Sequence, residues 1–278
     1  MKRVSCIAAM AVLGGMVSAQ AADMPIKAVK APAAQVYDWT GFYIGATAGA
    51  AWTTADLGLN PVNGPNLNYR PEDIPGVIAL GTQRLSGTHA IYGGRFGYNQ
   101  QFGGWVAGLE VDFSSFHFGN TSGASGNPFS FGGFSNGSMV LATNVSTSWL
   151  ATVRPRLGYA FDRVLVYGTG GAAFGKVGFS QTDVEFSFNG SGFGNEASAA
   201  SGVRTGWAAG AGIDYAAAPN WILSAEYLHV DLGSINSAGL VTSGNSTTTT
   251  LNFSTRIRRD IARAGISYKF GGPVVARY

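Results

Sequence analysis

The residues of this sequence whose side chains could do chemistry are few and widely spaced. The three histidines, His89, His117 and His229, are scattered, and no His-x-x-x-His or Cys/His spacing typical of a zinc site is present. A Gly-x-Ser-x-Gly pattern occurs once, at residues 133–137, but it lies in a Gly/Ser-rich connection and not between a strand and a helix, so we do not expect it to present a nucleophile. His117 and His229 both lie near those ends of apolar segments that precede a long connection. They are therefore either a shared metal or haem ligand pair or ordinary interfacial polar groups. We predict no catalytic residues, no metal site and no cofactor, and a protein that is not an enzyme.

A second group of polar residues has a regular spacing. These residues alternate with apolar residues along the same segments, so they fall on the opposite face of an expected strand. In residues 104–113, GWVAGLEVDF, one row holds Trp105, Leu109 and Phe113, and the other holds Glu110 and Asp112. The same division recurs along the chain and gives five cations and four anions: Arg95, Arg154, Arg156, Arg263, Lys269, Glu110, Asp112, Asp214 and Glu226. Nearly balanced charges predict a paired network.

Eight segments with this alternation carry the charged residues, and the connections between them alternate strictly between long and short. The segments are 41–54, 87–102, 105–118, 145–161, 164–178, 203–217, 221–233 and 257–270. Tight Gly, Pro, Asn or Asp turns alternate with four Ser/Thr/Asn/Gly-rich connections, 55–86, 119–144, 179–202 and 234–256. Antiparallel up-and-down strands would place all short turns at one end. Four long loops are uncommon in compact soluble domains but typical of outer-membrane barrels.

Tryptophan placement distinguishes a membrane barrel from a soluble sandwich. Three tryptophans lie at the short-turn ends of the segments and three at the long-loop ends: Trp39, Trp105 and Trp221, then Trp52, Trp149 and Trp207. Five tyrosines join the short-turn level: Tyr43, Tyr98, Tyr159, Tyr215 and Tyr268. Two aromatic levels are typical of the interfacial girdles of a membrane barrel, whose apolar rows face lipid. We therefore predict an all-β, eight-stranded antiparallel up-and-down transmembrane β-barrel over residues 39–270.

The lumen of an eight-stranded barrel is just wide enough for side chains to fill it. We expect the nine charged residues to form a network there that plugs and stiffens the barrel, so that no wide pore remains. One residue conflicts with a regular ladder, because Pro155 lies mid-strand and cannot donate a backbone hydrogen bond. We predict a β-bulge or a missing ladder bond beside Pro155.

The two ends of the chain have a different composition. Lys2 and Arg3, the apolar run 7–17 and the sequence Ala-Gln-Ala at 19–21 form the three parts of a secretory signal peptide, residues 1–21. The only cysteine, Cys6, would leave with it, so no disulfide is expected. Residues 22–38 are predicted to be a flexible periplasmic leader and 271–278 a periplasmic tail. A formal net charge of +3 without a dense Lys/Arg cluster argues against a nucleic-acid partner.

Several runs resemble the alphaproteobacterial outer membrane immunogenic protein family, whose members are small OmpA/OmpX-like eight-stranded barrels of the porin family. The runs are YDWTGFYIGATAGAAW (37–52), GLEVDF, RLGYAFDRVLVYGTGGAAFG (156–175), GWAAGAGIDYAAAPNWILSAEYLHVDLG (206–233) and RAGISYKFGGPVVARY (263–278). The last is also similar to a barrel-assembly signal, carried here by Gly265, Tyr268 and Phe270. Members commonly have glycine where this chain has Pro155, and the long connections carry no recognisable family motif, so no ligand specificity is carried over from relatives.

The resemblance implies an abundant envelope protein exposed to host or plant surfaces, and some members bind haem. We expect a structural outer-membrane barrel with periplasmic termini that displays four surface loops and contributes to envelope integrity and surface interaction. A narrow porin for small solutes or a haem-binding surface receptor is the alternative, and a barrel enzyme acting on lipid or peptide is a third class. The expected partners are outer-membrane lipid, the barrel assembly machinery and host or surface ligands of the loops.

Overall fold

The computed structural model describes residues 37–63, 69–131, 134–187, 192–243 and 246–271. The predicted signal peptide 1–21, all but two residues of the leader 22–38, and all but one residue of the tail 271–278 lie outside these ranges. No helix in the described residues is long and apolar enough to cross a membrane.

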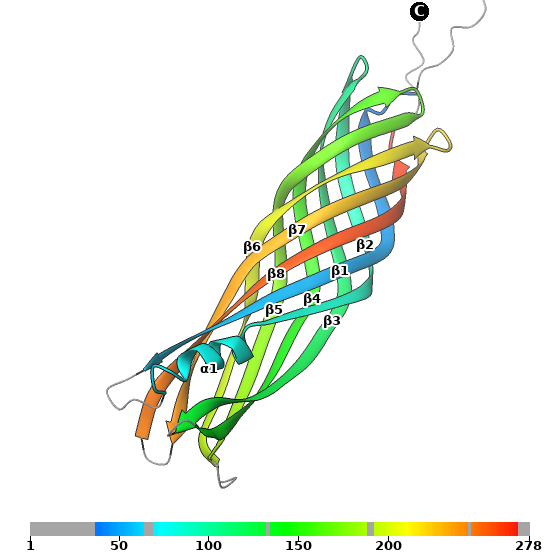
Figure 1. Ribbon diagram of the computed structural model, residues 1–278. Helices are drawn as coiled ribbons and strands as arrows, with labels where there is room; N and C mark the ends of the chain where they lie inside the picture. Colours follow the sequence, from blue (N-terminus) through cyan, green and yellow to red (C-terminus); the bar gives the residue numbers. More distant parts are fainter. Residues whose placement is uncertain (1–36, 64–68, 132–133, 188–191, 244–245, 272–278) are drawn as a thin grey trace, which may run out of the picture. The chain divides into compact units, whose positions relative to one another are not determined.

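Eight antiparallel strands form a closed barrel in chain order, and β1 pairs with β8 to close the ring (Figure 1). The strands are β1 (Gly41–Asn63), β2 (Gln83–Phe102), β3 (Trp105–Phe131), β4 (Phe134–Phe161), β5 (Val164–Ser187), β6 (Gly192–Ala216), β7 (Trp221–Ser243) and β8 (Ser246–Lys269). A short helix, α1 (Ile74–Gly81), lies in the connection between β1 and β2. The predicted fold class is confirmed.

The four long connections were expected to be loops, and this expectation is wrong for most of their residues. The strands run on through them and reach 20 to 28 residues, about twice the ~9–11 residues that a strand needs to cross a bilayer. The described residues therefore include a membrane half, which ends at Trp52 on β1 and Trp207 on β6, and a distal half beyond it. Serine, threonine and asparagine made these segments resemble loops, although the period of two continues through them.

Strand β1 shows how one strand serves two environments. In the membrane half its outward residues are apolar, and Phe42 and Ile44 are each 52% exposed. Beyond Trp52 the inward residues Leu57 and Leu59 are buried, and Thr54, Asp56 and Asn60 are among the outward residues. The alternation of the side chains is unbroken along β1. Apolar residues such as Phe42 and Ile44 therefore occupy outward positions before Trp52, and Leu57 and Leu59 occupy inward positions beyond it, without a shift in register. The distal half therefore has a largely apolar core, which also encloses some polar residues, and a mainly polar exterior.

The ladder at Pro155 is interrupted on one side only. Leu109 pairs with Pro155 in a regular β3–β4 register, but the β4–β5 pairing stops at Val153↔Ala172 and resumes at Arg156↔Thr169. The register is the same on both sides of this gap, so the irregularity is missing pairing and not a bulge. The hydroxyl of Thr169 donates to the carbonyl oxygen of Pro155 at 2.9 Å. The predicted missing bond is confirmed.

Replacing Pro155 by valine is expected to stabilise the barrel by about 1 kcal/mol, because valine supplies the missing N–H toward β5. Urea unfolding in lipid vesicles, followed by tryptophan fluorescence, measures the change. Leu157→Val is the control, since Leu157 faces lipid nearby and already pairs with Gly168. An unchanged or lower stability for Pro155→Val would contradict the expectation.

Candidate functional site

The centre of the membrane half is filled by ion pairs that Arg154 organises. Its guanidinium group is fully buried and donates to Glu110 at 2.8 Å, Asp112 at 2.9 Å and Glu226 at 2.9 Å. Its Nε also donates to the hydroxyl of Thr152 at 2.8 Å. Three carboxylates from β3 and β7 therefore share one cation from β4.

Arg263 on β8 supplies the second cation to the same carboxylates. Its Nη2 lies 2.6 Å from Glu226 and its Nη1 lies 3.1 Å from Asp112. The strand register places Glu226 directly opposite Arg263 and Glu110 directly opposite Arg154. Cross-strand neighbours of opposite charge are the pairs that a sheet brings together most closely.

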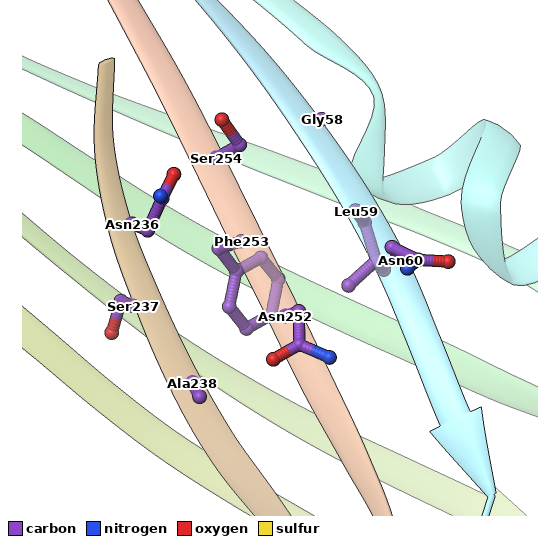
Figure 2. Close-up of a pocket in the computed structure, with 9 residues that line it drawn as sticks. All are labelled: Gly58, Leu59, Asn60, Asn236, Ser237, Ala238, Asn252, Phe253 and Ser254. Carbon is purple, nitrogen blue, oxygen red and sulfur yellow. The ribbon is translucent and has the colours of Figure 1, made fainter.

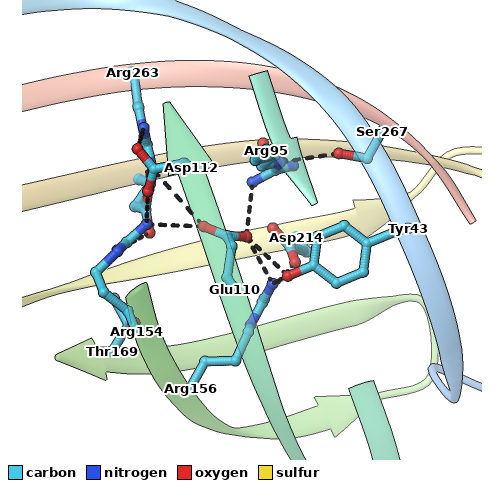
Figure 3. A network of polar contacts seen from close by, with 12 residues as sticks. Tyr43, Arg95, Glu110, Asp112, Arg154, Arg156, Thr169, Asp214, Arg263 and Ser267 are labelled. Carbon is cyan, nitrogen blue, oxygen red and sulfur yellow. Dashed lines mark hydrogen bonds and ion pairs between the residues drawn. The ribbon is translucent and has the colours of Figure 1, made fainter. Parts of the chain in front are cut away.

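A second group of contacts lies around Tyr43, between Glu110 and the arginines nearer the short turns (Figure 3). The hydroxyl of Tyr43 donates to Glu110 at 2.8 Å and accepts from Arg156 at 3.0 Å. Arg156 also pairs with Asp214 at 2.5 Å, and its guanidinium carbon lies 3.7 Å from the ring centroid of Tyr167. Such a cation–π contact adds to the ion pair.

Arg95 completes the network from β2. Its guanidinium lies 3.8 Å from Glu110 and donates to Ser267 at 2.9 Å and Ser224 at 2.8 Å. The network therefore joins four arginines and four carboxylates, and each of these residues is at most 6% exposed. Balanced charges with hydrogen-bonded partners are the condition under which buried ions are tolerated. Eight of the nine predicted lumen residues come together here.

The ninth, Lys269, lies elsewhere, and its predicted place in the network is wrong. Its ammonium group donates to the backbone carbonyl of Asp38 and lies 4.7 Å from the ring centroid of Tyr37. Lys269 is inward-facing and buried, as the alternation predicts, but it is the last inward position of β8. It therefore meets the chain that crosses the short-turn end, beyond the reach of the carboxylates.

Trp39 is part of the same end and not of an outward girdle, which corrects the prediction for this residue. It is fully buried, and its indole nitrogen donates to the carbonyl of Asp162 at 3.0 Å. Its backbone N–H donates to Gln101 at 2.8 Å. Trp39 precedes β1, so the alternation of that strand does not apply to it. Residues 37–40 thus close the short-turn mouth of the barrel.

Trp39→Phe is expected to destabilise the barrel by about 1–2 kcal/mol, because phenylalanine fills the site but leaves the Asp162 carbonyl without its donor. The loss is measured by incubating samples at increasing temperatures and running them, without boiling, on SDS gels that separate folded from unfolded protein. Trp105→Phe is the matched control, since Trp105 is 56% exposed on the lipid side. Equal losses in the two variants would contradict a sealing role for Trp39.

Comparison with known proteins agrees with this geometry. The sequence profile described as "Outer membrane protein beta-barrel domain" matches residues 8–270. The chain belongs to this outer-membrane β-barrel family. It is 35% identical over 271 residues to the 31 kDa outer-membrane immunogenic proteins of Brucella melitensis and Brucella suis, with 91% of this chain and 94% of each relative covered. The resemblance to the immunogenic proteins and the outer-membrane location are therefore confirmed.

Two solved structures are similar to this outer-membrane barrel at a lower level. OprG of Pseudomonas aeruginosa has a TM-score of 0.41 at 12% identity, with 85% of this chain and 99% of that chain covered. The OmpT protease of Escherichia coli has a TM-score of 0.44 at 12% identity, with 84% and 98% covered.

The other five predicted tryptophans of the outer-membrane barrel lie on its outward side. Trp52, Trp105, Trp207 and Trp221 are 45–56% exposed, and Trp149 stacks on the exposed ring of Phe113 at 5.9 Å. Tyr43 was expected at the same short-turn level, but it points inward and is 2% exposed. Its position in the inward row of β1 was the signal that could have placed it. Tyr43 therefore belongs to the lumen network.

The predicted assembly signal lies at the end of the last strand. Tyr268 and Phe270 are exposed on the lipid side, and Gly265 is partly buried. The ring of Tyr268 makes edge contacts with Trp221 at 5.4 Å and with Phe270 at 5.2 Å. These contacts form one aromatic cluster at the short-turn level, and the role in assembly stays a prediction.

His117 and His229 do not form a shared site. His117 is exposed on β3, whereas His229 lies on β7, four strands away around the barrel. His229 bonds to Asp260 at 2.8 Å and contacts the ring of Trp207. Within the described ranges, no three His, Cys, Asp or Glu side chains are arranged to hold a metal. The interfacial interpretation describes His229, and the paired-ligand hypothesis is wrong.

The outer surface of the distal half carries a groove of about 570 Å³ over β7, β8 and β1, and asparagine and serine side chains are among those that line it (Figure 2). The register places Asn60 beside Asn252, and Asn236 beside Ser254. Leu59 and Phe253 lie under this row and face the core. The groove therefore offers amide and hydroxyl groups on a rigid sheet, and it was not predicted, because the residues were assigned to loops.

Proposed function

We propose that this protein is a structural barrel of the outer membrane that contributes to envelope integrity and presents its distal half for surface interaction. Side chains fill the barrel interior in three successive regions, which supports this proposal. The regions are the short-turn mouth around Trp39, the charge network around Arg154 and the largely apolar core of the distal half. The charge network carries the proposal, because eight buried and mutually paired ions occupy the space that a solute would need. A narrow porin would need a water-filled lumen instead.

The same proposal assigns an orientation and partners. The short turns and both termini would face the periplasm, because outer-membrane barrels carry short turns on that side. Outer-membrane lipid would contact the outward apolar residues of the membrane half, and the barrel assembly machinery would recognise the end of β8. Host or surface ligands would meet the distal half, where polar side chains such as those of Asn60 and Asn252 are presented. No nucleic-acid partner and no enzymatic activity are proposed.

Bilayer recordings test the closed lumen. Purified protein in a planar bilayer is expected to give no steady single-channel steps, while a wide porin recorded in parallel does. Steady steps of uniform size from the pure protein would overturn the proposal in favour of the porin. A deletion strain that leaks periplasmic enzymes, and is rescued by the intact gene, would support the role in envelope integrity.

A haem titration separates the second alternative from the first. The protein in detergent is expected to produce no saturable Soret shift, because His117 and His229 lie on opposite sides of the barrel. A saturable shift that His229→Ala abolishes would support a haem receptor and contradict the proposal.

A further inference from the structure

Two acidic residues of the distal half face each other inside the barrel. Asp183 on β5 and Glu196 on β6 are directly opposite in the register, and they are 0% and 3% exposed. Like charges in directly opposite positions of a sheet destabilise it. This cross-strand pair therefore needs something that removes or balances its charge.

The polar atoms around this pair lack partners. Ser198 lies near Glu196, and Glu185 and the Val184 backbone lie near Asp183, but within the described residues no donor reaches the carboxylate oxygens of Asp183 or Glu196 with hydrogen-bond geometry. The next inward pair toward the membrane is Gln181 and Ser198, which are 4% and 8% exposed. The amide nitrogen of Gln181 and the hydroxyl of Ser198 also lack partners. Buried polar groups are nearly always satisfied, so six such atoms on four neighbouring residues indicate a ligand.

The amide of Gln181 can present its oxygen as well as its nitrogen. Its oxygen now accepts from the hydroxyl of Thr143 at 3.0 Å. A half-turn about the last side-chain bond would let that hydroxyl accept from the nitrogen instead, since a hydroxyl is both donor and acceptor. The oxygen of Gln181 would then join the oxygens of Asp183, Glu196 and Ser198.

The barrel wall is split beside these residues. β6 and β7 pair from Trp207↔Asp231 toward the short turns, and beyond that only at Asn195↔Thr242. Residues 196–206 of β6 keep their pairing with β5 but have no partners on β7. Glu196 lies over Gly239 of β7 so closely that a Cβ there would meet its carboxylate. The split gives this acidic pair a boundary of unpaired backbone.

The surrounding charges are acidic as well. Glu185 is the next inward residue of β5, and the hydroxyl of Tyr69 donates to it. Burial, followed by the charges of Glu185 and Glu196, raises the pKa of Asp183 to about 8. Burial also raises the pKa of Glu196. In the described ranges no lysine or arginine forms an ion pair with Asp183 or Glu196.

We propose that Asp183, Glu196, Ser198 and Gln181 form a binding site for one divalent hard cation of the calcium type. Two carboxylates match its charge, and the two neutral side chains add oxygen ligands. Calcium accepts six to eight oxygens in irregular arrangements, whereas magnesium requires a near-ideal octahedron and zinc prefers His and Cys. Glu185 lies beside Asp183 but already accepts from the hydroxyl of Tyr69, so water or strand carbonyls at the split would supply the remaining ligands.

Calcium titration of the protein in detergent, after treatment with EDTA, tests the site. Calorimetry is expected to show one Ca²⁺ per chain, and bound Tb³⁺ is expected to luminesce on excitation of nearby Tyr69. Asp183→Asn and Glu196→Gln are each expected to weaken binding at least tenfold. Asp56→Asn is the matched control, because Asp56 is a carboxylate of the distal half that already pairs with Arg84 and Arg258.

Each outcome decides the proposal. Saturable binding that is lost in both acidic variants and kept in Asp56→Asn supports it. If the acidic variants do not give the folded band on unheated gels, Ser198→Ala keeps both charges and is expected to weaken binding several-fold. Absence of saturable binding, or binding that survives all of these changes, overturns the site and leaves the carboxyls neutralised by protons and water.

Discussion

Replacing Arg154 by alanine is expected to destabilise the barrel by about 3–5 kcal/mol, the range for removing one partner of a buried ion pair. Arg154 donates to Glu110, Asp112 and Glu226, and all three carboxylates are at most 6% exposed. Arg263 would remain as the nearest cation to two of them. The variant therefore retains the desolvation cost of three carboxylates without the charge that offsets it.

Urea unfolding in lipid vesicles measures this loss, with Arg84→Ala as the control. The side chain of Arg84 is 68% exposed and lies 3.2 Å from Asp56, so its removal is expected to cost less than about 1 kcal/mol. Replacing Arg154 together with Glu226 should cost less than the sum of the two single changes, because the pair is removed as a unit. Equal, small losses for Arg154→Ala and Arg84→Ala would contradict the role of the network in stability.

Asp183→Asn is expected to stabilise the calcium-free protein at pH 8 by several kcal/mol, roughly 5, because the pKa of Asp183 lies about four units above its ordinary value. The pKa of Asp183 is raised from 3.8 to about 8, first by burial and then by Glu185 and Glu196. A raised pKa in the folded state means that the stabilising contribution is fully present below pH 3.8. It is lost progressively as the pH rises to about 8. Asparagine carries no charge at any of these values and removes the effect.

The measurement is the free energy of unfolding between pH 5 and pH 9 in EDTA. The wild type should lose stability with rising pH more steeply than Asp183→Asn, and the two should converge toward pH 5. Asp56→Asn, which changes an outward carboxylate, should follow the wild type in slope. Parallel curves for the wild type and Asp183→Asn would show that Asp183 is ionised in the folded state at all these values.

The membrane half could be predicted because one physical rule governs each strand there. Alternation alone places Glu110 and Asp112 on one side and Trp105 and Phe113 on the other, and the membrane assigns these sides to lumen and lipid. The alternation predicts toward which side of the sheet a side chain points, but not which residues it contacts there. Lys269 faces inward as predicted, yet its partners come from the segment before β1, which no period describes.

The distal half was missed because its polar residues were interpreted as loops. Leu57 and Leu59 continue the period of two beyond Trp52, but serine- and asparagine-rich connections are also typical of turns. The site around Asp183 and Glu196 depends on the register of β5 against β6 within this half. Sequence spacing alone cannot supply a register between two hairpin arms that were both expected to be irregular.

The ring is closed by its first and last strands, which lie more than 180 residues apart along the chain. β1 pairs with β8 from Tyr43↔Lys269 to Asn63↔Thr249, so the outer edges of β1 and β7 are paired only after the final strand is in place. A polypeptide truncated before residue 246 would expose β1 and β7 as open edges, which template aggregation. Closure of the barrel therefore requires the last strand, and a chain that lacks it keeps two open sheet edges.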